Sequence, residues 1–238
     1  MDAGATIKRE RKVKEFTPSQ NGLKFTNRFP GLPLPEPLAT LIDTSKSVHG
    51  LCGGMVFTTI DYMKSKKEPP ATTAVPDEDT KLYDYLKKRQ VASWGLLDTQ
   101  VLRYVWWMGL NDEKAQEETL DSWREIRKKL DKEDFAVVGL IYHNFHETLA
   151  VWDNHQVLAY GYQELEDGTI RILLYDPNFP KEDDIYIEAK GVKIKKPGKP
   201  EFGMKAGQFK GGKHLYNLHG FMLVPYEYNE PPDGAGFG

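Results

Sequence analysis

The residue best suited to covalent chemistry is Cys52, the single cysteine in the 238-residue chain. It lies in the sequence GLCGGM (residues 50–55), and apolar residues recur at helical spacing from Met55 onward. A helix N-terminus stabilises a thiolate, and flanking glycines leave backbone N–H groups open to an oxyanion. The pattern therefore predicts a nucleophilic thiol at the start of a helix. The alternative is a small buried apolar residue, which is a common role of free cysteine.

His155 is the predicted base for this thiol, because it opens an apolar run that is typical of a β-strand. A histidine at a sheet edge can present its imidazole to a neighbouring thiol. Asp176 ends the next predicted strand, within the sequence YDPN (175–178). Since hairpin strands lie side by side, its carboxylate can reach the imidazole and orient it, as in a catalytic triad. The alternatives are a histidine satisfied by core or loop contacts, and an aspartate that serves only its turn.

Three sequences, GLCGGM, NHQVLAYGY and LLYDPNFP, together resemble the landmarks of the papain-like cysteine peptidase superfamily. The most similar branch is that of the double-glycine leader peptidases (peptidase C39-like), where histidine precedes an apolar strand and aspartate-proline follows it. The resemblance covers roughly residues 45–66 and 135–180. It implies a two-lobed fold, with the cysteine on a helical lobe and the base on a sheet lobe. It also implies acyl transfer, usually amide hydrolysis, through a thioester intermediate, without a metal or an organic cofactor.

The donors to the oxyanion are less well marked than the triad. Enzymes of this superfamily usually carry a glutamine several residues before the cysteine, and the sequence DTSKSVH (43–49) has none. The candidates in this chain, beside the Cys52 backbone N–H, are Ser45, Ser47, His49, Gly53, Gly54 and Asn154. Loss of one oxyanion donor costs about 10²–10³ in rate. The missing glutamine therefore also fits weak or lost activity.

Helices are predicted in the first half of the domain and strands in the second. Apolar periodicity predicts helices at 52–68, at 81 to about 110, and at 111–132. Compact apolar runs predict strands at 135–142, 155–162, 169–175, 185–189 and 221–226. This order gives an α+β, papain-like fold, with a helical lobe packed on a mostly antiparallel sheet. The predicted catalytic domain spans 21–228, with the helical part at about 50–132 and the sheet part at about 134–228.

Three further segments are predicted to lack regular structure. Residues 1–20 are charged without a period, so we expect a flexible basic arm that is solvated or touches an acidic partner. Residues 190–213 hold eight lysines and several glycines, and are expected to form a long loop, either a mobile flap near the cleft or a solvated loop. Residues 229–238 are expected to be a disordered tail.

Composition and charge narrow the classes of partner. One cysteine excludes an intrachain disulfide and a thiol-rich zinc site. The formal net charge of −3 argues against wholesale binding to nucleic acid or a membrane. We expect a cytoplasmic protein, because the N-terminus lacks the apolar core of a secretory signal and no apolar run approaches the roughly 20 residues of a membrane span. The HNFHE sequence (143–147) lacks the helical spacing of paired histidine ligands, so we predict a polar loop and no metal site.

The functional prediction is a cysteine-nucleophile hydrolase or acyltransferase that acts on a peptide or another acyl-containing substrate. Cys52 would be the nucleophile, His155 the general base and then acid, and Asp176 the orienting group. The main alternative is a catalytically inert papain-like scaffold with a binding or structural role. A third possibility is a nucleic-acid-associated protein that uses the basic N-terminal segment and the lysine-rich segment.

Overall fold

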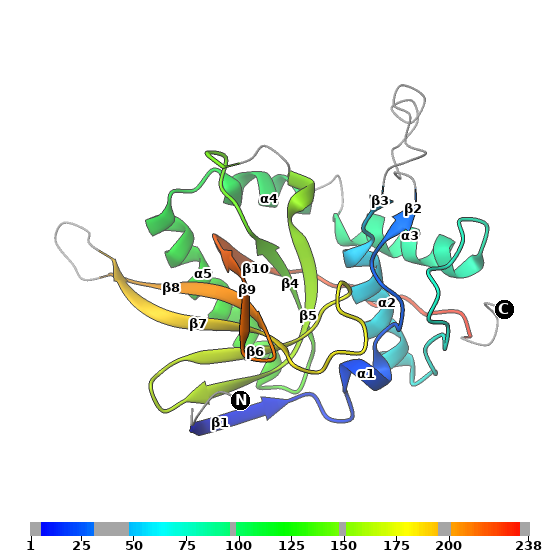
Figure 1. Ribbon diagram of the computed structural model, residues 1–238, viewed down its shortest axis with the longest axis horizontal. Helices are drawn as coiled ribbons and strands as arrows, with labels where there is room; N and C mark the ends of the chain where they lie inside the picture. The colour runs from blue at the N-terminus through cyan, green and yellow to red at the C-terminus, as the bar shows by residue number, and fades with distance from the viewer. Residues whose placement is uncertain (1–5, 31–47, 96–98, 148–150, 195–200, 234–238) are drawn as a thin grey trace.

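The fold is α+β, with helices from the first half of the chain packed beside a curled antiparallel sheet from the second half (Figure 1). The structure is a computed structural model that describes residues 6–30, 48–95, 99–147, 151–194 and 201–233. Each predicted helix and strand has a counterpart in these ranges. Several elements that the sequence analysis did not predict join them.

The helices begin and end at recognisable local features. They are α1 (Pro18–Asn21), α2 (Cys52–Ser65), α3 (Lys81–Ser93), α4 (Thr99–Met108) and α5 (Asp112–Leu130). The side chains of Thr80 and Asn111 cap α3 and α5 by accepting hydrogen bonds from backbone N–H groups in the first turn. The helix that we predicted from 81 to about 110 is instead two helices, and Gly95, with a φ of +80°, follows the first.

The main sheet is antiparallel throughout the described residues. Its strands are β4 (Ala136–Ile141), β5 (His155–Leu165), β6 (Ile170–Tyr175), β7 (Ile185–Ile194), β8 (Glu201–Lys210), β9 (Lys213–Leu218) and β10 (Gly220–Val224). The strand order is β10-β4-β5-β6-β7-β8-β9. Because only His219 separates β9 from β10, one stretch of chain joins the two ends of this order, and the sheet curls. Two-residue strands β2 (Phe29–Pro30) and β3 (Val48–His49) form a separate small sheet.

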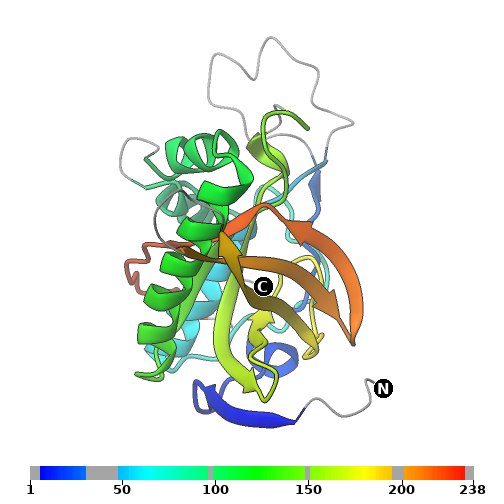
Figure 2. The same cartoon turned by 90° about the vertical axis from the view of Figure 1, so that its left-hand side faces the viewer.

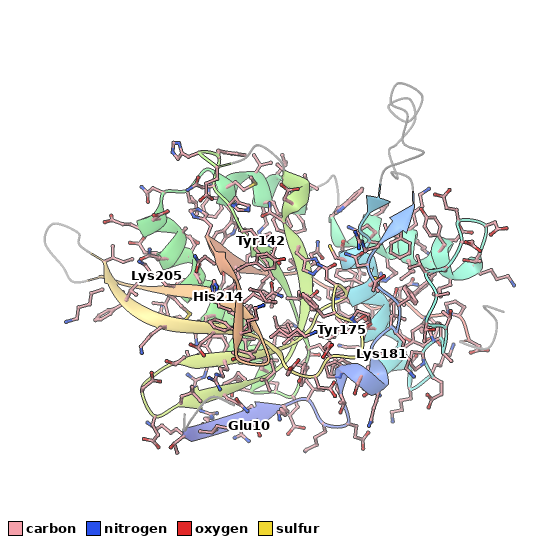
Figure 3. The ribbon with its side chains drawn as sticks, in the orientation of Figure 1. Glu10, Tyr142, Tyr175, Lys181, Lys205 and His214 are labelled. Atoms are coloured by element: carbon pink, nitrogen blue, oxygen red, sulfur yellow. The ribbon has the colours of Figure 1, made fainter. Side chains whose placement is uncertain are left out.

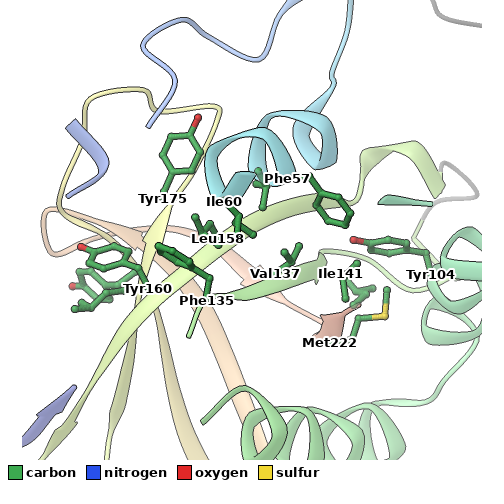
Figure 4. Packing of buried hydrophobic residues seen from close by; sticks show 14 of the residues in the cluster. Phe57, Ile60, Tyr104, Phe135, Val137, Ile141, Leu158, Tyr160, Tyr175 and Met222 are labelled. Carbon is green, nitrogen blue, oxygen red and sulfur yellow. The ribbon is translucent and has the colours of Figure 1, made fainter. Parts of the chain in front are cut away.

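Alternating side chains of β4 and β5 supply two different cores. Val137 and Leu158 face α2, where they meet Ile60 and Phe57 (Figure 4). The next residues on each strand belong to a second core with α5, which runs along the curled sheet (Figure 2). This two-residue period explains why both strands are buried along nearly their whole length. The first core matters for the site, because it fixes α2 across β5.

The prediction of a flexible arm at 1–20 is wrong for its described part. Residues Ile7–Lys12 form β1, which pairs antiparallel with β5, and α1 follows. β1 buries almost no side chain, so no hydrophobic alternation marks it in the sequence. Backbone pairing and surface contacts such as the Arg9–Asp131 ion pair (3.0 Å) hold it on the sheet.

The prediction of a long loop at 190–213 is also wrong. β7 and β8 pair from Ile185↔Lys210 to Ile194↔Glu201, and β9 then pairs with β8. Residues 195–200 lie outside the described part. The described lysines of this hairpin lie at exposed or partly exposed positions, whereas Met204 is buried. The lysine-rich composition therefore reflects the solvent-facing side of a ribbon.

Residues 229–233 pack against the rest of the protein, which corrects the predicted disordered tail at 229–238 for its described part. The anchor of this C-terminal segment is the carboxylate of Asp61 on α2, which is fully buried. Tyr226 donates a hydrogen bond to Asp61 Oδ1 at 2.7 Å, and the backbone N–H of Asn229 donates to the same atom at 3.1 Å. Arg89 Nε lies 2.7 Å from Asp61 Oδ2. A single buried carboxylate thus ties the segment after β10 to α2 and α3.

Within the described residues, no helix has both the length and the apolar character needed to cross a bilayer.

We expect Asp61→Ala to lower the free energy of unfolding by about 3–5 kcal/mol, because it leaves the buried Arg89 guanidinium without its anionic partner. Urea denaturation followed by circular dichroism measures the change. Asp121→Ala is the matched control, since it removes the exposed Arg124–Asp121 pair and should cost less than about 1 kcal/mol. Similar losses in the two variants would contradict the anchoring role of Asp61.

Candidate active site

The first turn of α2 holds Cys52 in a defined position. Leu51 and Met55, on either side of it, are fully buried in a cluster with α3 and residues 23–29. The Leu51 N–H donates to Asn27 Oδ1 at 2.6 Å, and the Gly54 N–H donates to Gln90 Oε1 at 2.8 Å. Cys52 itself is partly exposed. The cysteine is therefore anchored by its neighbours and keeps partial contact with solvent as a residue.

His155 and Asp176 meet through the pairing of β5 with β6. His155 is the first residue of β5, and Asp176 directly follows Tyr175, the last residue of β6. His155 Nε2 lies 2.7 Å from Asp176 Oδ1, and both side chains are buried. Since Asp176 occupies Nε2, the Nδ1 atom is left to face the thiol. The structure thus brings the three predicted catalytic side chains together; their role in catalysis stays a prediction.

The electrostatics of the thiol and the imidazole favour an ion pair. Burial opposes ionisation of Cys52, but hydrogen bonding and charge interaction with His155, together with the backbone N–H groups of Gln156 and Gly53, lower the thiol pKa below its ordinary value. Burial would also lower the pKa of His155, but the adjacent Asp176 carboxylate and the Cys52 sulfur raise it to about 10. The lowered thiol pKa and the raised imidazole pKa favour a thiolate beside an imidazolium.

The Asp176 carboxylate has a full set of donors. Oδ1 accepts from the Asn178 backbone N–H at 2.9 Å, in addition to its bond with His155. Oδ2 accepts from Gln208 Nε2 at 2.6 Å. Gln208 Oε1 in turn accepts from the Tyr142 hydroxyl at 3.0 Å. The carboxylate is thus held from its own turn and from β8.

Asn27 connects the two halves of the site. Its Oδ1 accepts from the N–H that precedes Cys52, and its Nδ2 donates to Asn178 Oδ1 at 3.1 Å. Its backbone N–H donates to the Pro177 carbonyl at 3.1 Å. One asparagine therefore spans from the start of α2 to the turn that carries Asp176.

Sequence analysis missed Asn27 and Gln208. Asn27 lies between elements, and no periodic pattern marks it. Gln208 was placed in a loop, although Phe202, Met204 and Ala206 alternate with other residues as in a strand. Gln208 lies on the same face of the strand as Met204, and both side chains are buried. A polar residue on the buried side of a strand was the available indication that it has a partner.

The predicted oxyanion donors fare differently. Gly54 and Asn154 already make other hydrogen bonds, which argues against their predicted role. The Gly54 N–H donates to Gln90. Asn154 Nδ2 donates to the Val151 carbonyl at 3.0 Å, and Asn154 Oδ1 accepts from the Tyr142 backbone N–H. The Gly53 N–H points to the Cys52 sulfur. The structure describes the strand of His49 but not its side chain, and Ser45 and Ser47 lie outside the described residues. The Cys52 N–H has no acceptor among the described residues, which leaves it open to a ligand.

The HNFHE sequence forms a local polar contact, with His143 Nδ1 at 3.2 Å from Glu147 Oε2. Among the residues that the structure describes, no group of three or more histidine, cysteine or acidic side chains is arranged to hold a metal ion.

The sequence matches no protein-family model and no curated protein. A functional argument for this chain therefore depends on the residues of the site and their contacts.

We expect Gly53→Ala to disturb the thiol. A Cβ at this position would lie 2.1 Å from Ser93 Oγ and 2.7 Å from Gln156 Oε1, both on buried side chains. Such overpacking costs about 1–3 kcal/mol and shifts the backbone, so the rate of Cys52 alkylation should fall together with the free energy of unfolding. Gly191→Ala is the control, since no atom lies within 4 Å of its Cβ. Unchanged alkylation in Gly53→Ala would show that the first turn of α2 tolerates a side chain there.

Proposed function

We propose that this chain is a papain-like cysteine hydrolase or acyltransferase that acts on an amide or ester bond through a thioester. The observation that carries the proposal is the contact of the Cys52 thiol with an imidazole that is itself bonded to a buried carboxylate. An inert core cysteine would not need a base and an orienting group arranged in this way. The cysteine at the start of a helix and the base on an antiparallel strand also agree with the papain-like resemblance.

The first half-reaction follows from these positions. The Cys52 thiolate attacks the carbonyl carbon, and the carbonyl π electrons move to the oxygen. The open Cys52 N–H at the start of α2 can donate to this oxyanion. Collapse of the tetrahedral intermediate breaks the bond to the leaving group, which takes a proton from the His155 imidazolium. The products are an amine or alcohol and a thioester on Cys52.

The second half-reaction restores the site. Neutral His155 removes a proton from water or from an acceptor amine as the oxygen or nitrogen attacks the thioester carbon. Collapse breaks the carbon–sulfur bond, so that Cys52 leaves as a thiolate beside the imidazolium. Asp176 remains ionised and holds the imidazole in the orientation that both steps need. Water as acceptor gives hydrolysis, and an amine gives transfer.

A catalytically inert binding scaffold is the second candidate function. Two observations favour it: no glutamine precedes Cys52 at the usual place, and the Gly54 and Asn154 donors are engaged elsewhere. A site of this kind would keep the thiol and imidazole as parts of a binding surface.

The rate of Cys52 alkylation by iodoacetamide, measured against pH, tests the ion pair. We expect fast labelling at about pH 6, well below the ordinary thiol pKa of ~8.5, because the imidazolium stabilises the thiolate. In His155→Ala burial still raises the thiol pKa, and only the hydrogen bonds from the Gln156 and Gly53 backbone N–H groups oppose it, so the labelling curve should move to the ordinary range or above it. His146→Ala, which changes an exposed histidine, should label like the wild type. A wild-type curve with an ordinary thiol midpoint would contradict the proposal.

Trapping of an acyl-enzyme separates the enzyme from the inert scaffold. We expect p-nitrophenyl acetate to acetylate Cys52 as a hydroxylamine-sensitive thioester, because the thiolate is the strongest nucleophile of the site. Intact-mass and peptide mass spectrometry locate the acetyl group, and Cys52→Ser should lack it. Asp176→Asn should acetylate more slowly, since it disturbs the orientation of His155. Acetylation confined to lysines would favour the inert scaffold.

A further inference from the structure

Gln208 on β8 is a buried side chain whose two polar atoms are both committed. It is 1% exposed, its Nε2 lies 2.6 Å from Asp176 Oδ2, and its Oε1 lies 3.0 Å from the Tyr142 hydroxyl. A carboxylate accepts hydrogen bonds only, so the Gln208 NH₂ group must face Asp176. The tyrosine O–H then meets the amide oxygen, for which it is the correct partner. The Asp176 carboxylate thus sets which way the amide points, and the Tyr142 O–H stabilises that orientation.

The carboxylate depends on this amide for one of its two oxygens. Asp176 Oδ1 accepts hydrogen bonds from His155 and from the Asn178 N–H. Among the described residues, Oδ2 accepts a hydrogen bond only from Gln208. Without the amide, Oδ2 would be a buried acceptor with no donor from the described residues, which is costly for a charged oxygen. Rotation of the carboxyl group toward another donor would then take Oδ1 away from His155.

We propose that Gln208, oriented by Tyr142, is a positioning residue that keeps the Asp176 carboxylate turned toward His155. This inference rests on the proposed function, since its effect reaches the substrate only through His155 and Cys52. It makes the hairpin of β8 and β9 part of the active site. Tyr142 extends from the end of β4 (Figure 3), and its ring packs edge-on against Tyr216 of β9, with the centroids 5.2 Å apart. Tyr216 is 53% exposed, so this chain of contacts runs from the surface to the thiol.

Among the described residues, the other titratable side chains that interact electrostatically with Cys52 or Asp176 are tyrosines. Burial raises the pKa of each, so they stay neutral over the range in which the ion pair titrates; they are Tyr104 on α4, Tyr142 after β4 and Tyr175 on β6. The charge on the thiol is therefore governed by the imidazole and the carboxylate. A change at Gln208 should consequently appear in the pH dependence of the thiol.

The test is the alkylation curve of Cys52 in Gln208→Met, which keeps the length of the side chain and removes both hydrogen bonds. Near pH 6 we expect the rate to fall at least about tenfold, the size that loss of a hydrogen bond to a charged group gives. At about pH 9, above the ordinary thiol pKa, the rates should converge, because the thiol then ionises without help. Gln163→Met is the matched control, since Gln163 also donates to a carboxylate, Glu10, on the surface of the same sheet.

Tyr142→Phe provides a second variant with a smaller change in packing. It removes the O–H that orients Gln208, so its curve should shift in the same direction by a smaller amount. Tyr162→Phe is its control, because Tyr162 on β5 donates to Asp131 at the end of α5, away from Cys52. If both site variants lower stability and leave the acid side of the curve unchanged, Gln208 is only structural and the inference is wrong. If the wild type itself behaves as an ordinary thiol, the proposed function fails, and the inference fails with it.

Discussion

The packing of α2 across β5 is the constraint on which the rest of the site depends. Ile60 and Phe57 fill the face of the sheet that Leu158 and Val137 present, and this contact fixes the helix relative to the strand. The helix begins at Cys52 and the strand begins at His155. A hydrophobic contact well inside both elements therefore determines that a thiol and an imidazole meet at their ends. The polar site is precise because it lies at the margin of a close-packed core.

Polar contacts then close the junction between the helical part and the sheet. Asn27 joins the residue before the nucleophile to the turn after Asp176, and Gln208 joins that aspartate to β8. Both amides are fully used, so each side chain has one favourable orientation. This matters for a thiolate–imidazolium pair, since its stability in a buried setting depends on fixed dipoles that need no rearrangement when charge develops.

A second buried carboxylate, away from the site, is also held by several partners. Asp61 accepts hydrogen bonds from the C-terminal segment and forms an ion pair with Arg89 on α3. The Arg89 guanidinium also lies over the Phe57 ring, with its central carbon 4.9 Å from the ring centroid. Phe57 belongs to the core that positions α2. The C-terminal segment is therefore linked through one carboxylate to the packing that places the nucleophile.

The sequence alone determined the elements whose signals are local. α2, α5 and the strands β4, β5 and β6 each carry a complete apolar pattern, so they were predicted, and the hairpin of β5 and β6 put Asp176 beside His155. β1, β8 and β9 were missed, because much of their surface is exposed and backbone pairing with distant strands holds them. Only the tertiary structure decided that Gln208 and Asn27 reach the site, and that Gly54 and Asn154 are occupied. A hydrogen bond between residues far apart in the chain produces no periodic sequence pattern around either residue, since it depends on how whole elements pack.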